Sequence, residues 1–208
     1  MRNKKLSRKL NCKLIFGFIR MLILIPAVLG GFSCKTAEFG CQTIDVNGMI
    51  YDFDNRPVPH CEVTIGSKYC GITDINGRFS LPKIPEGTYV ITGIKNGFET
   101  YTEEITISGW GQIIYIRMPS QAQLLELADQ ALTNLDYAAA CENAEKAYLI
   151  DNKSTEAVFY YAIVKYRQGE SQKALEILEK ASADGIRDIY IDKFIKTIKE
   201  ARSENTSE

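Results

Sequence analysis

The C-terminal third of the chain resembles itself at a spacing of 34 residues. Three alanines and one acidic residue recur at that spacing, and the matched pairs are Ala128 with Ala162, Ala140 with Ala174, Ala147 with Ala181, and Asp136 with Glu170. A period of this length with small residues at fixed places is typical of antiparallel helix pairs that stack. Alanine suits a crossing point because its methyl group lets two helix backbones approach closely. The repeat therefore predicts an all-α array in this part of the chain.

The helical periodicity divides this region into five predicted helices. They cover residues 122–134, 137–150, 154–168, 171–183 and 188–202. The first four helices form two repeats, at about 121–154 and 155–188, within a helical domain of residues 119–202. The fifth helix has polar Asp192 and Lys196 where the repeat needs packing residues, which predicts a solvating cap. The polar tail, residues 203–208, is predicted to be disordered.

These repeats resemble the tetratricopeptide repeat family, whose helix pairs present a groove to peptides or other proteins. In that family the first helix of each pair lines the groove. The corresponding positions are Leu125, Asp129, Leu132 and Thr133 in the first repeat and Glu156, Phe159, Ile163, Tyr166 and Arg167 in the second. The resemblance implies partner binding through Leu125, Asp129, Phe159, Ile163, Tyr166 and Arg167, because aromatic residues and arginine are common hot spots.

An alternative reading of these helices leaves no free groove. The region before the repeats or the fifth helix would then cover some of the groove residues within the same chain. Tyr160 and Tyr161 are expected to pack between helices in either case. Two repeats and a cap are close to the smallest stable array, so any groove is small.

Before the helices, the sequence changes to short apolar runs separated by turn residues. The predicted strands are residues 44–53, 61–65, 69–73, 78–81, 88–95, 100–107 and 112–118. Seven closely spaced strands with regular turn signals favour a β-sandwich over residues 43–118. The linker to the helices, Pro119-Ser120-Gln121, is so short that the two domains are expected to abut.

The order of the turn motifs in this region is itself informative. Arg56-Pro57-Val58-Pro59 is followed by Thr73-Asp74-Ile75-Asn76-Gly77-Arg78, then by Ile84-Pro85-Glu86-Gly87-Thr88-Tyr89 and Lys95-Asn96-Gly97-Phe98. This order closely resembles the carboxypeptidase regulatory-like family, whose fold is a transthyretin-like sandwich. The second half also looks like the related PEGA domains. The resemblance implies a non-catalytic accessory module.

The N-terminus has the pattern of an export signal. Seven basic residues and no acidic residue lie within residues 1–34, and an apolar run, Met21–Leu29, is followed by Gly30-Gly31-Phe32-Ser33-Cys34. This resembles the lipobox of bacterial lipoproteins, although Gly31 stands where that motif usually has leucine. The resemblance implies a signal peptide over residues 1–33, lipidation of Cys34 and a tether over residues 34–42. The alternatives are an uncleaved N-terminal anchor and cleavage without lipid.

The charge distribution argues against nucleic-acid binding. The whole chain has a net charge of −1, but residues 35–208 hold 18 of the 25 basic residues and all 26 acidic residues. A body with that acidic excess is repelled by a phosphate backbone.

Few residues have the spacing of a metal or catalytic site. No two cysteines stand at a CxxC spacing, so a zinc site has almost no support, and His60 is interpreted as a strand-edge residue. A two-residue turn at Gly66-Ser67 would place Cys61 opposite Ile72 and Cys70 opposite Val63. Two buried free thiols are favoured over a disulfide in that register.

Two loop features remain as weaker candidates. Trp110, between two glycines, could stack on a sugar ring, although such a residue more often covers the end of a core. Asp74-Ile75-Asn76-Gly77 has half the pattern of a calcium loop, with Asp52 and Asp54 as the other nearby acidic residues, but it lacks the later ligands. We therefore expect no catalytic residue, metal or cofactor.

These observations together predict a non-enzymatic protein of the bacterial cell envelope. It would be anchored to the membrane by lipid on Cys34 and would bind or scaffold a partner protein or peptide through its helical groove. The sequence leaves the membrane leaflet and side open. The alternatives are a carbohydrate-binding module that acts through the sandwich and Trp110, and a structural spacer with no ligand.

Overall fold

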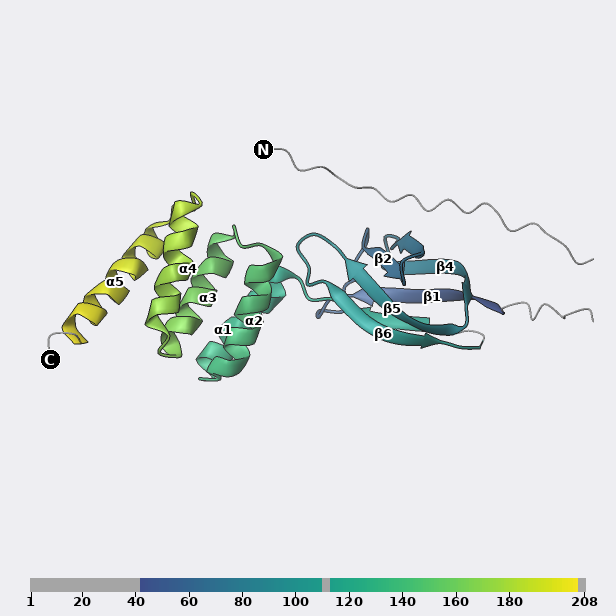
Figure 1. Cartoon of the computed structure of the whole chain (residues 1–208), viewed down its shortest axis with the longest axis horizontal. Coiled ribbons are helices and arrows are strands. Elements are labelled where there is room, and N and C mark those ends of the chain that lie inside the picture. The colour runs from purple at the N-terminus through teal and green to yellow at the C-terminus, as the bar shows by residue number, and fades with distance from the viewer. Residues whose placement is uncertain (1–41, 110–112, 206–208) are drawn as a thin grey trace, which may run out of the picture. The chain divides into compact units, whose positions relative to one another are not determined.

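The structure is a computed structural model that describes residues 42–109 and 113–205. In these residues strands come first and helices follow, and both belong to one compact unit (Figure 1). The strands are β1 (Thr43–Tyr51), β2 (Glu62–Ile65), β3 (Tyr69–Ile72), β4 (Arg78–Pro85), β5 (Gly87–Ile94), β6 (Tyr101–Ile107) and β7 (Ile113–Arg117). The helices are α1 (Gln121–Thr133), α2 (Tyr137–Ile150), α3 (Thr155–Arg167), α4 (Ser171–Ala183) and α5 (Ile189–Asn205).

The seven strands form two sheets that share one core. The first sheet has the order β4-β1-β7, with β1 antiparallel to β4 and parallel to β7, and the second has the antiparallel order β3-β2-β5-β6. Buried residues alternate with exposed ones along β1, as a strand with one face on the core requires. The core consists of Ile44, Val46, Ile50, Val58, Cys61, Val63, Ile65, Phe79, Leu81, Ile84, Ile91, Ile107, Ile114, Ile116 and Met118.

A glycine in β1 makes room for the one phenylalanine of this core. Gly48 pairs with Phe79 across the antiparallel ladder. A Cβ atom on Gly48 would lie 2.2 Å from Cζ of Phe79 and 2.7 Å from the carbonyl oxygen of Ile114. The absence of a side chain at this position therefore lets Phe79 pack against β1 at 4% exposure.

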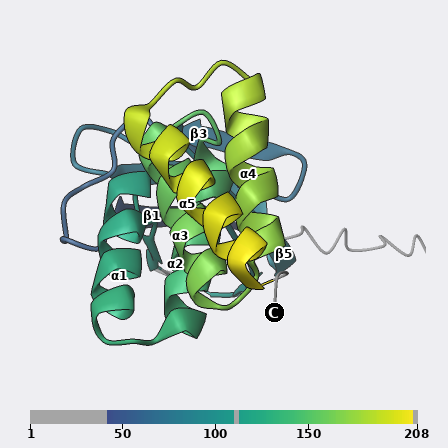
Figure 2. The ribbon, with the colours of Figure 1, turned by 90° about the vertical axis from the view of Figure 1, so that its left-hand side faces the viewer.

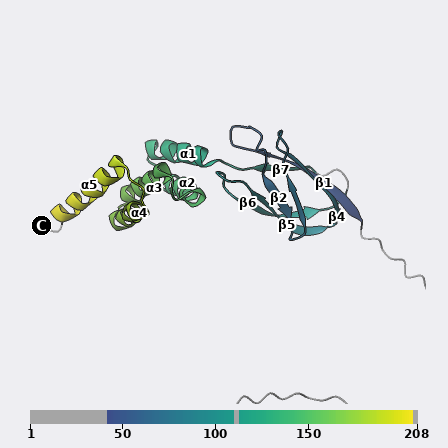
Figure 3. The ribbon, with the colours of Figure 1, turned by 90° about the horizontal axis from the view of Figure 1, so that it is seen from above.

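The helices pack as two successive antiparallel pairs followed by α5. Viewed along the array, α1 and α4 lie at opposite edges with α3 and α5 between them (Figure 2), and the view from above again separates α1 from α4 (Figure 3). α1 contacts α3 directly as well as its partner α2. All six alanines of the 34-residue repeat are buried, at 0 to 4% exposure, which agrees with a role at helix crossings.

Hydrogen bonds join the β-sandwich to the first helix. Gln121 donates its backbone N–H to the carbonyl oxygen of Gly97 at 2.9 Å, and Glu99 donates to that of Pro119 at 3.0 Å. The Gln123 side chain closes a capping box with Ser120 at the start of α1. Its Nε2 also donates to Oδ2 of Asp54 at 2.8 Å, so one side chain both caps the helix and contacts the sandwich.

The predicted succession of seven strands and five helices is confirmed, with boundaries that mostly agree within two residues. β4 is the main exception, because it continues through Pro82 to Pro85 where a turn is predicted. A proline is tolerated there because β4 is an edge strand and its ladder with β1 is irregular at this point, between the pairs Val46–Leu81 and Ile44–Ile84. α5 likewise continues to Asn205, so residues 203–205 are helical and the predicted disorder of this part of the tail is wrong.

Within the described residues, none of the helices combines the length and the apolar character that a membrane crossing requires.

Candidate functional site

The surface of α3 that the sequence singles out is partly buried. Phe159, Ile163 and Tyr166 follow one another at intervals of four and three residues, so they lie on one face of the helix. All three side chains are half-buried, while Arg167, one residue further on, is exposed. The structure thus brings four of the six predicted binding residues together on α3. We call these four residues the α3 face.

The aromatic residues of the α3 face contact α5. The ring centroid of Phe194 lies 5.8 Å from that of Phe159 and 5.5 Å from that of Tyr166. The interplanar angles are 69° and 80°, which is the edge-to-face arrangement that aromatic pairs prefer. Phe194 therefore occupies the space between the two predicted anchor residues, as in the alternative in which the fifth helix covers part of the groove.

The two predicted binding residues on α1 differ in their exposure. Leu125 is only 5% exposed and packs with Leu124, Ala147 and Ala157, so in this structure it belongs to the core and is not accessible to a partner. Its burial depends on how α2 and α3 close over α1, which the repeat phase does not specify. Asp129 is exposed, and its Oδ1 accepts a hydrogen bond from the Tyr160 hydroxyl at 3.1 Å.

Tyr160 is therefore a link between the first helices of the two pairs. Burial and the hydrogen bond to Asp129 raise the pKa of its hydroxyl, so the neutral phenol that donates this bond is maintained. The expectation that Tyr160 packs between helices is confirmed, because it contacts the buried clusters of α1, α2 and α3.

A second aromatic cluster lies between α2 and α3. The rings of Tyr148 and Tyr161 stack with centroids 5.2 Å apart, and Lys165 Nζ lies 5.4 Å from the centroid of Tyr161. Lys165 also lies 3.6 Å from Oε2 of Glu170. Sequence reasoning placed Tyr161 between helices correctly but missed its stacking on Tyr148, because a residue of α2 and one of α3 are paired only by the tertiary fold.

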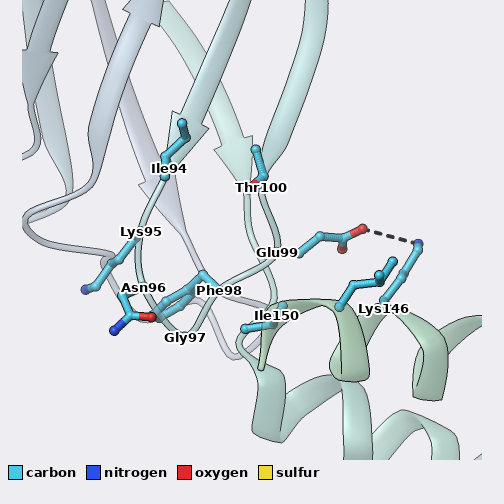
Figure 4. Close-up of a pocket in the computed structure, with 10 residues that line it drawn as sticks. Ile94, Lys95, Asn96, Gly97, Phe98, Glu99, Thr100, Lys146 and Ile150 are labelled. Atoms are coloured by element: carbon cyan, nitrogen blue, oxygen red, sulfur yellow. Dashed lines mark ion pairs between the residues drawn. The ribbon is translucent and has the colours of Figure 1, made fainter. Parts of the chain in front are cut away.

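A cavity of about 520 Å³ lies where the loop after β5 meets the end of α2 (Figure 4). Its apolar lining includes Ile94, Phe98, Leu149 and Ile150. Two lysines lie at the rim, and both have partners. Lys146 Nζ is 3.6 Å from Glu99 and 3.0 Å from Glu142, while Lys95 Nζ donates to the carbonyl oxygen of Pro59 at 2.7 Å.

The charges around this cavity are balanced. The hydrogen bond to Glu142 is the main reason that the pKa of Lys146 is raised, with Glu99 adding to the effect although partial burial opposes it. Lys95 lies 4.9 Å above the ring of Phe98 in addition to its bond with Pro59. Because both ammonium groups already have partners, this cavity offers no unpaired charge to a ligand. Its exposed apolar residues are Ile94, at 48%, and Leu149, at 75%.

The calcium candidates are two turns of the same design. Oδ1 of Asp74 accepts from the backbone N–H groups of Asn76 and Arg78, both at 2.8 Å. Oδ1 of Asp52 accepts from those of Asp54 and Arg56, at 2.9 and 2.8 Å. These oxygens therefore organise the backbone of each turn. In the part of the chain that the structure describes, acidic, cysteine and histidine side chains form no cluster of three that could hold a metal.

The predicted register of the β2–β3 hairpin is wrong by one residue. Glu62 pairs with Ile72 and Thr64 with Cys70, so the loop contains three residues, Gly66, Ser67 and Lys68. Because side chains alternate along a strand, Cys61 points into the core while Cys70 is exposed on the outer face. Both thiols are free, and the expected burial of Cys70 is wrong.

Three other residues singled out in the sequence are placed as follows. His60 is exposed in the turn just before β2, with a φ of 55°, and its N–H donates to the carbonyl oxygen of Thr73. Cys34 and Trp110 lie outside the described residues.

Comparisons with known proteins give little guidance on this surface. No protein-family model matches the chain, and no curated protein matches it either. Among solved structures, a type II cohesin–X-dockerin complex from Acetivibrio cellulolyticus is 21% identical, with a TM-score of 0.33 over 38% of this chain and 58% of that chain. The major pilin subunit of Bacillus cereus is 15% identical, with a TM-score of 0.32 over 38% and 30%.

A third similar structure is a candidate carbohydrate-binding protein from Pseudomonas aeruginosa. It is 18% identical, with a TM-score of 0.29 over 36% of this chain and 88% of that chain. The present chain thus spans little more than half of the cohesin–dockerin chain and about a third of the pilin subunit. At these identities and TM-scores, the similarities do not distinguish one function from another.

Proposed function

We propose that the chain is a non-enzymatic protein of a bacterial cell envelope, anchored by lipid on Cys34, whose helices hold a segment of a partner protein. In this proposal the β region is a transthyretin-like accessory module and the helices are a short tetratricopeptide-type array. The buried alanines at 34-residue spacing support the second assignment. The order of turn motifs between β1 and β7 supports the first.

The single observation that carries the binding proposal is the α3 face. It combines two half-buried aromatic rings, Phe159 and Tyr166, with the exposed guanidinium of Arg167 on adjacent turns of one helix. Aromatic residues and arginine dominate the energetics of protein interfaces because they combine a large apolar area with directed polar contacts. A site of this composition suits a peptide segment.

The proposed anchor keeps the sandwich close to the membrane. β1 begins at Thr43, so about eight residues would separate a lipidated Cys34 from the first strand. Fully extended at ~3.3 Å per residue, such a tether reaches only ~26 Å. The helices, which follow the sandwich in the chain, would then present the α3 face to other envelope proteins.

The binding proposal is tested by charge reversal at Arg167. The full chain would be displayed on native envelope membranes, crosslinked, and its neighbours quantified by mass spectrometry. We expect Arg167→Glu to reduce capture of one protein at least tenfold, while the matched control Lys180→Glu, an exposed reversal on α4, leaves it unchanged. If the wild-type chain, Arg167→Glu and Lys180→Glu are crosslinked to the same proteins in the same amounts, binding through this face is refuted.

The anchor is tested separately by mass spectrometry of the mature N-terminus. A chain that begins at Cys34 and carries acyl groups is expected. A chain that begins at an unmodified Met1, or a mature Cys34 without lipid, would remove the anchor from the proposal and leave the binding surface untouched.

One observation favours carbohydrate binding as a second candidate function. Tyr115 on β7 is 67% exposed and pairs with Met49 on the outer face of the β4-β1-β7 sheet, which could give a sugar ring a flat surface. A glycan array probed with the wild-type chain, Tyr115→Ala and Trp110→Ala tests this candidate. Signals that depend on either side chain would support it, and a blank array would exclude it for the glycans displayed.

A further inference from the structure

We infer that α5 is an intramolecular occupant of the proposed binding surface, and that the partner is an amphipathic helix with an aromatic anchor that competes with α5. This inference rests on the proposed function and gives it a partner class and a means of regulation. It would also explain why the most favourable binding residues of the chain are half-buried.

The buried residues of α5 have the spacing of a helical peptide bound in a groove. Ile191 and Ile198 are fully buried, and Phe194 and Ile195 are partly buried against α3 and α4. These positions follow the i, i+3, i+4, i+7 pattern by which an amphipathic helix binds a hydrophobic groove. The other side of α5 is exposed and, beyond Ile189 and Tyr190 in its first turn, polar, so α5 has one face for the array and one for solvent.

Phe194 is the residue of α5 that enters the α3 face. Its ring lies edge-to-face with both Phe159 and Tyr166, at 5.8 and 5.5 Å between centroids. The same two rings are the anchors expected to hold a partner. A partner helix can therefore use them fully only if it brings an aromatic residue of its own and Phe194 withdraws.

The second half of α5 meets α4 along a largely polar edge. An open hollow of about 380 Å³ on this edge is lined by Gln172, Leu175, Glu179, Lys199, Arg202 and Ser203. Exposed polar contacts of this kind add little to stability, so the second half of α5 is held less firmly than an apolar interface would hold it.

The rim of this interface indicates the charge of a competing helix. Lys199 Nζ lies 2.7 Å from Oε1 of Glu179, and Arg202 donates to Oε1 of Gln172. Glu176 and Glu179 are exposed along the same edge of α4. A partner with basic residues one to two turns after its aromatic anchor would reproduce these contacts.

The inference is tested with a fluorescein-labelled peptide of residues 186–205, the α5 sequence itself. Its affinity is measured by anisotropy for the full wild-type chain and for the full chain with Phe194→Ala. In the wild-type chain the tethered α5 competes at a high effective concentration, so binding is weak. Loss of the Phe194 ring weakens that competitor, and we expect at least a tenfold higher affinity for the variant.

Two controls separate competition from nonspecific exposure of the core. A peptide that itself carries Phe194→Ala must bind the variant chain no more tightly than the wild-type chain. Adding Phe159→Ala and Tyr166→Ala to the variant chain must abolish the increase in peptide affinity. Lys199→Glu in the chain places a negative charge beside Glu179 and leaves the aromatic rings unchanged, so it must raise the peptide affinity by a smaller factor. Adding Glu179→Lys to the same chain must remove that increase. The Lys199 variants keep the test decisive if Phe194→Ala unfolds the array.

Equal peptide affinity for all folded chains would overturn the inference. So would light scattering that shows a dimer of the wild-type chain dissociated by the peptide, because the occupant would then be a second copy. If the envelope partner depends on Arg167 but is captured equally by wild-type and Phe194→Ala chains, only this inference fails. If no neighbour depends on Arg167, the proposed function fails even when the peptide binds.

Discussion

The loop within each helix pair shows how the two repeats differ. The first pair turns at Leu135 with a φ of 61°, and the second turns 34 residues later at Gly169 with a φ of 82°. Both residues follow the C-terminus of a first helix, where a left-handed residue commonly ends the helix. The backbone conformation is thus repeated more strictly than the residue that adopts it, and the first pair accepts a strained leucine where the second has glycine.

The residue after each of these loops also acts differently. Asp136 caps α2 by accepting a hydrogen bond from Ala139 N–H at 3.1 Å. Glu170 makes no side-chain cap at the start of α4, and its Oε2 lies 2.9 Å from Lys173 and 3.6 Å from Lys165. One acidic position thus supports the first pair by a local hydrogen bond and the second by ion pairs, one of which reaches back to α3.

The pairs differ most in their cores, and exchanging a core residue should have the largest effect. Leu178 is fully buried where the first pair has Ala144. We expect Leu178→Ala to lower the free energy of unfolding by about 2–5 kcal/mol, because it removes apolar contacts and leaves a cavity. Urea unfolding followed by circular dichroism at 222 nm measures this loss.

The reciprocal change sharpens this comparison. Ala144→Leu should cost about 1–3 kcal/mol, since α1 and α2 approach too closely for a larger side chain. Leu149→Ala, at a position that is 75% exposed, is the control and should stay within about 0.5 kcal/mol. If Leu178→Ala costs no more than this control, the difference between the two cores does not contribute to stability.

Removing the cap of α2 should have the next largest effect. Asp136→Ala is expected to lower the free energy of unfolding by about 1 kcal/mol, because the N–H of Ala139 loses its acceptor. Asp136→Asn keeps an acceptor and should retain most of the stability. A thermal melt of both variants would contradict the capping role if they unfold at the same temperature.

Making the two loops alike should have a smaller effect of the opposite sign. Leu135→Gly relieves about 1–2 kcal/mol of left-handed strain, although glycine also adds about 1 kcal/mol of freedom to the unfolded chain. A net gain of about 0.5 kcal/mol is therefore expected. Leu135→Ala, which removes the exposed side chain but keeps the Cβ atom, is the control. An equal gain from both variants would show that backbone strain is not the cause.

The ion pairs of Glu170 should give the smallest and most pH-dependent effect. The hydrogen bond with Lys173, and then the charge of Lys165, lower the pKa of Glu170 in the folded chain. The stabilisation is therefore complete above the ordinary pKa of a glutamate and is lost as the pH falls through the lowered folded value. Glu170→Gln should be slightly destabilising at pH 7 and neutral at strongly acidic pH. A difference that does not change with pH would exclude this explanation.

Much of the secondary structure could be predicted because it depends on local patterns. The recurring alanines and the helical periodicity define α1 to α4 within two residues, and the turn residues separate the strands. The β2–β3 register could not be predicted, since two-residue and three-residue loops begin with the same Gly66-Ser67. A shift of one residue then reversed the face of Cys70.

The candidate site shows the same division between local pattern and tertiary contact. Repeat phase correctly placed Phe159, Ile163, Tyr166 and Arg167 on one helix face. It did not show that Phe194 fills the space between two of them, because the packing angle of α5 is set by side chains of α3 and α4 together. The burial of Leu125 was missed for a similar reason.

The sequence by itself determined the elements of this protein and their order, because helix period, strand alternation and turn residues act within a few positions of one another. Only the tertiary structure decided which binding residues remain accessible. Exposure depends on what packs over a residue from distant parts of the chain, and α5 covers Phe159 and Tyr166 from about 30 residues away. The 34-residue period thus predicts the scaffold, and the fit of one terminal helix decides how much of its surface is free.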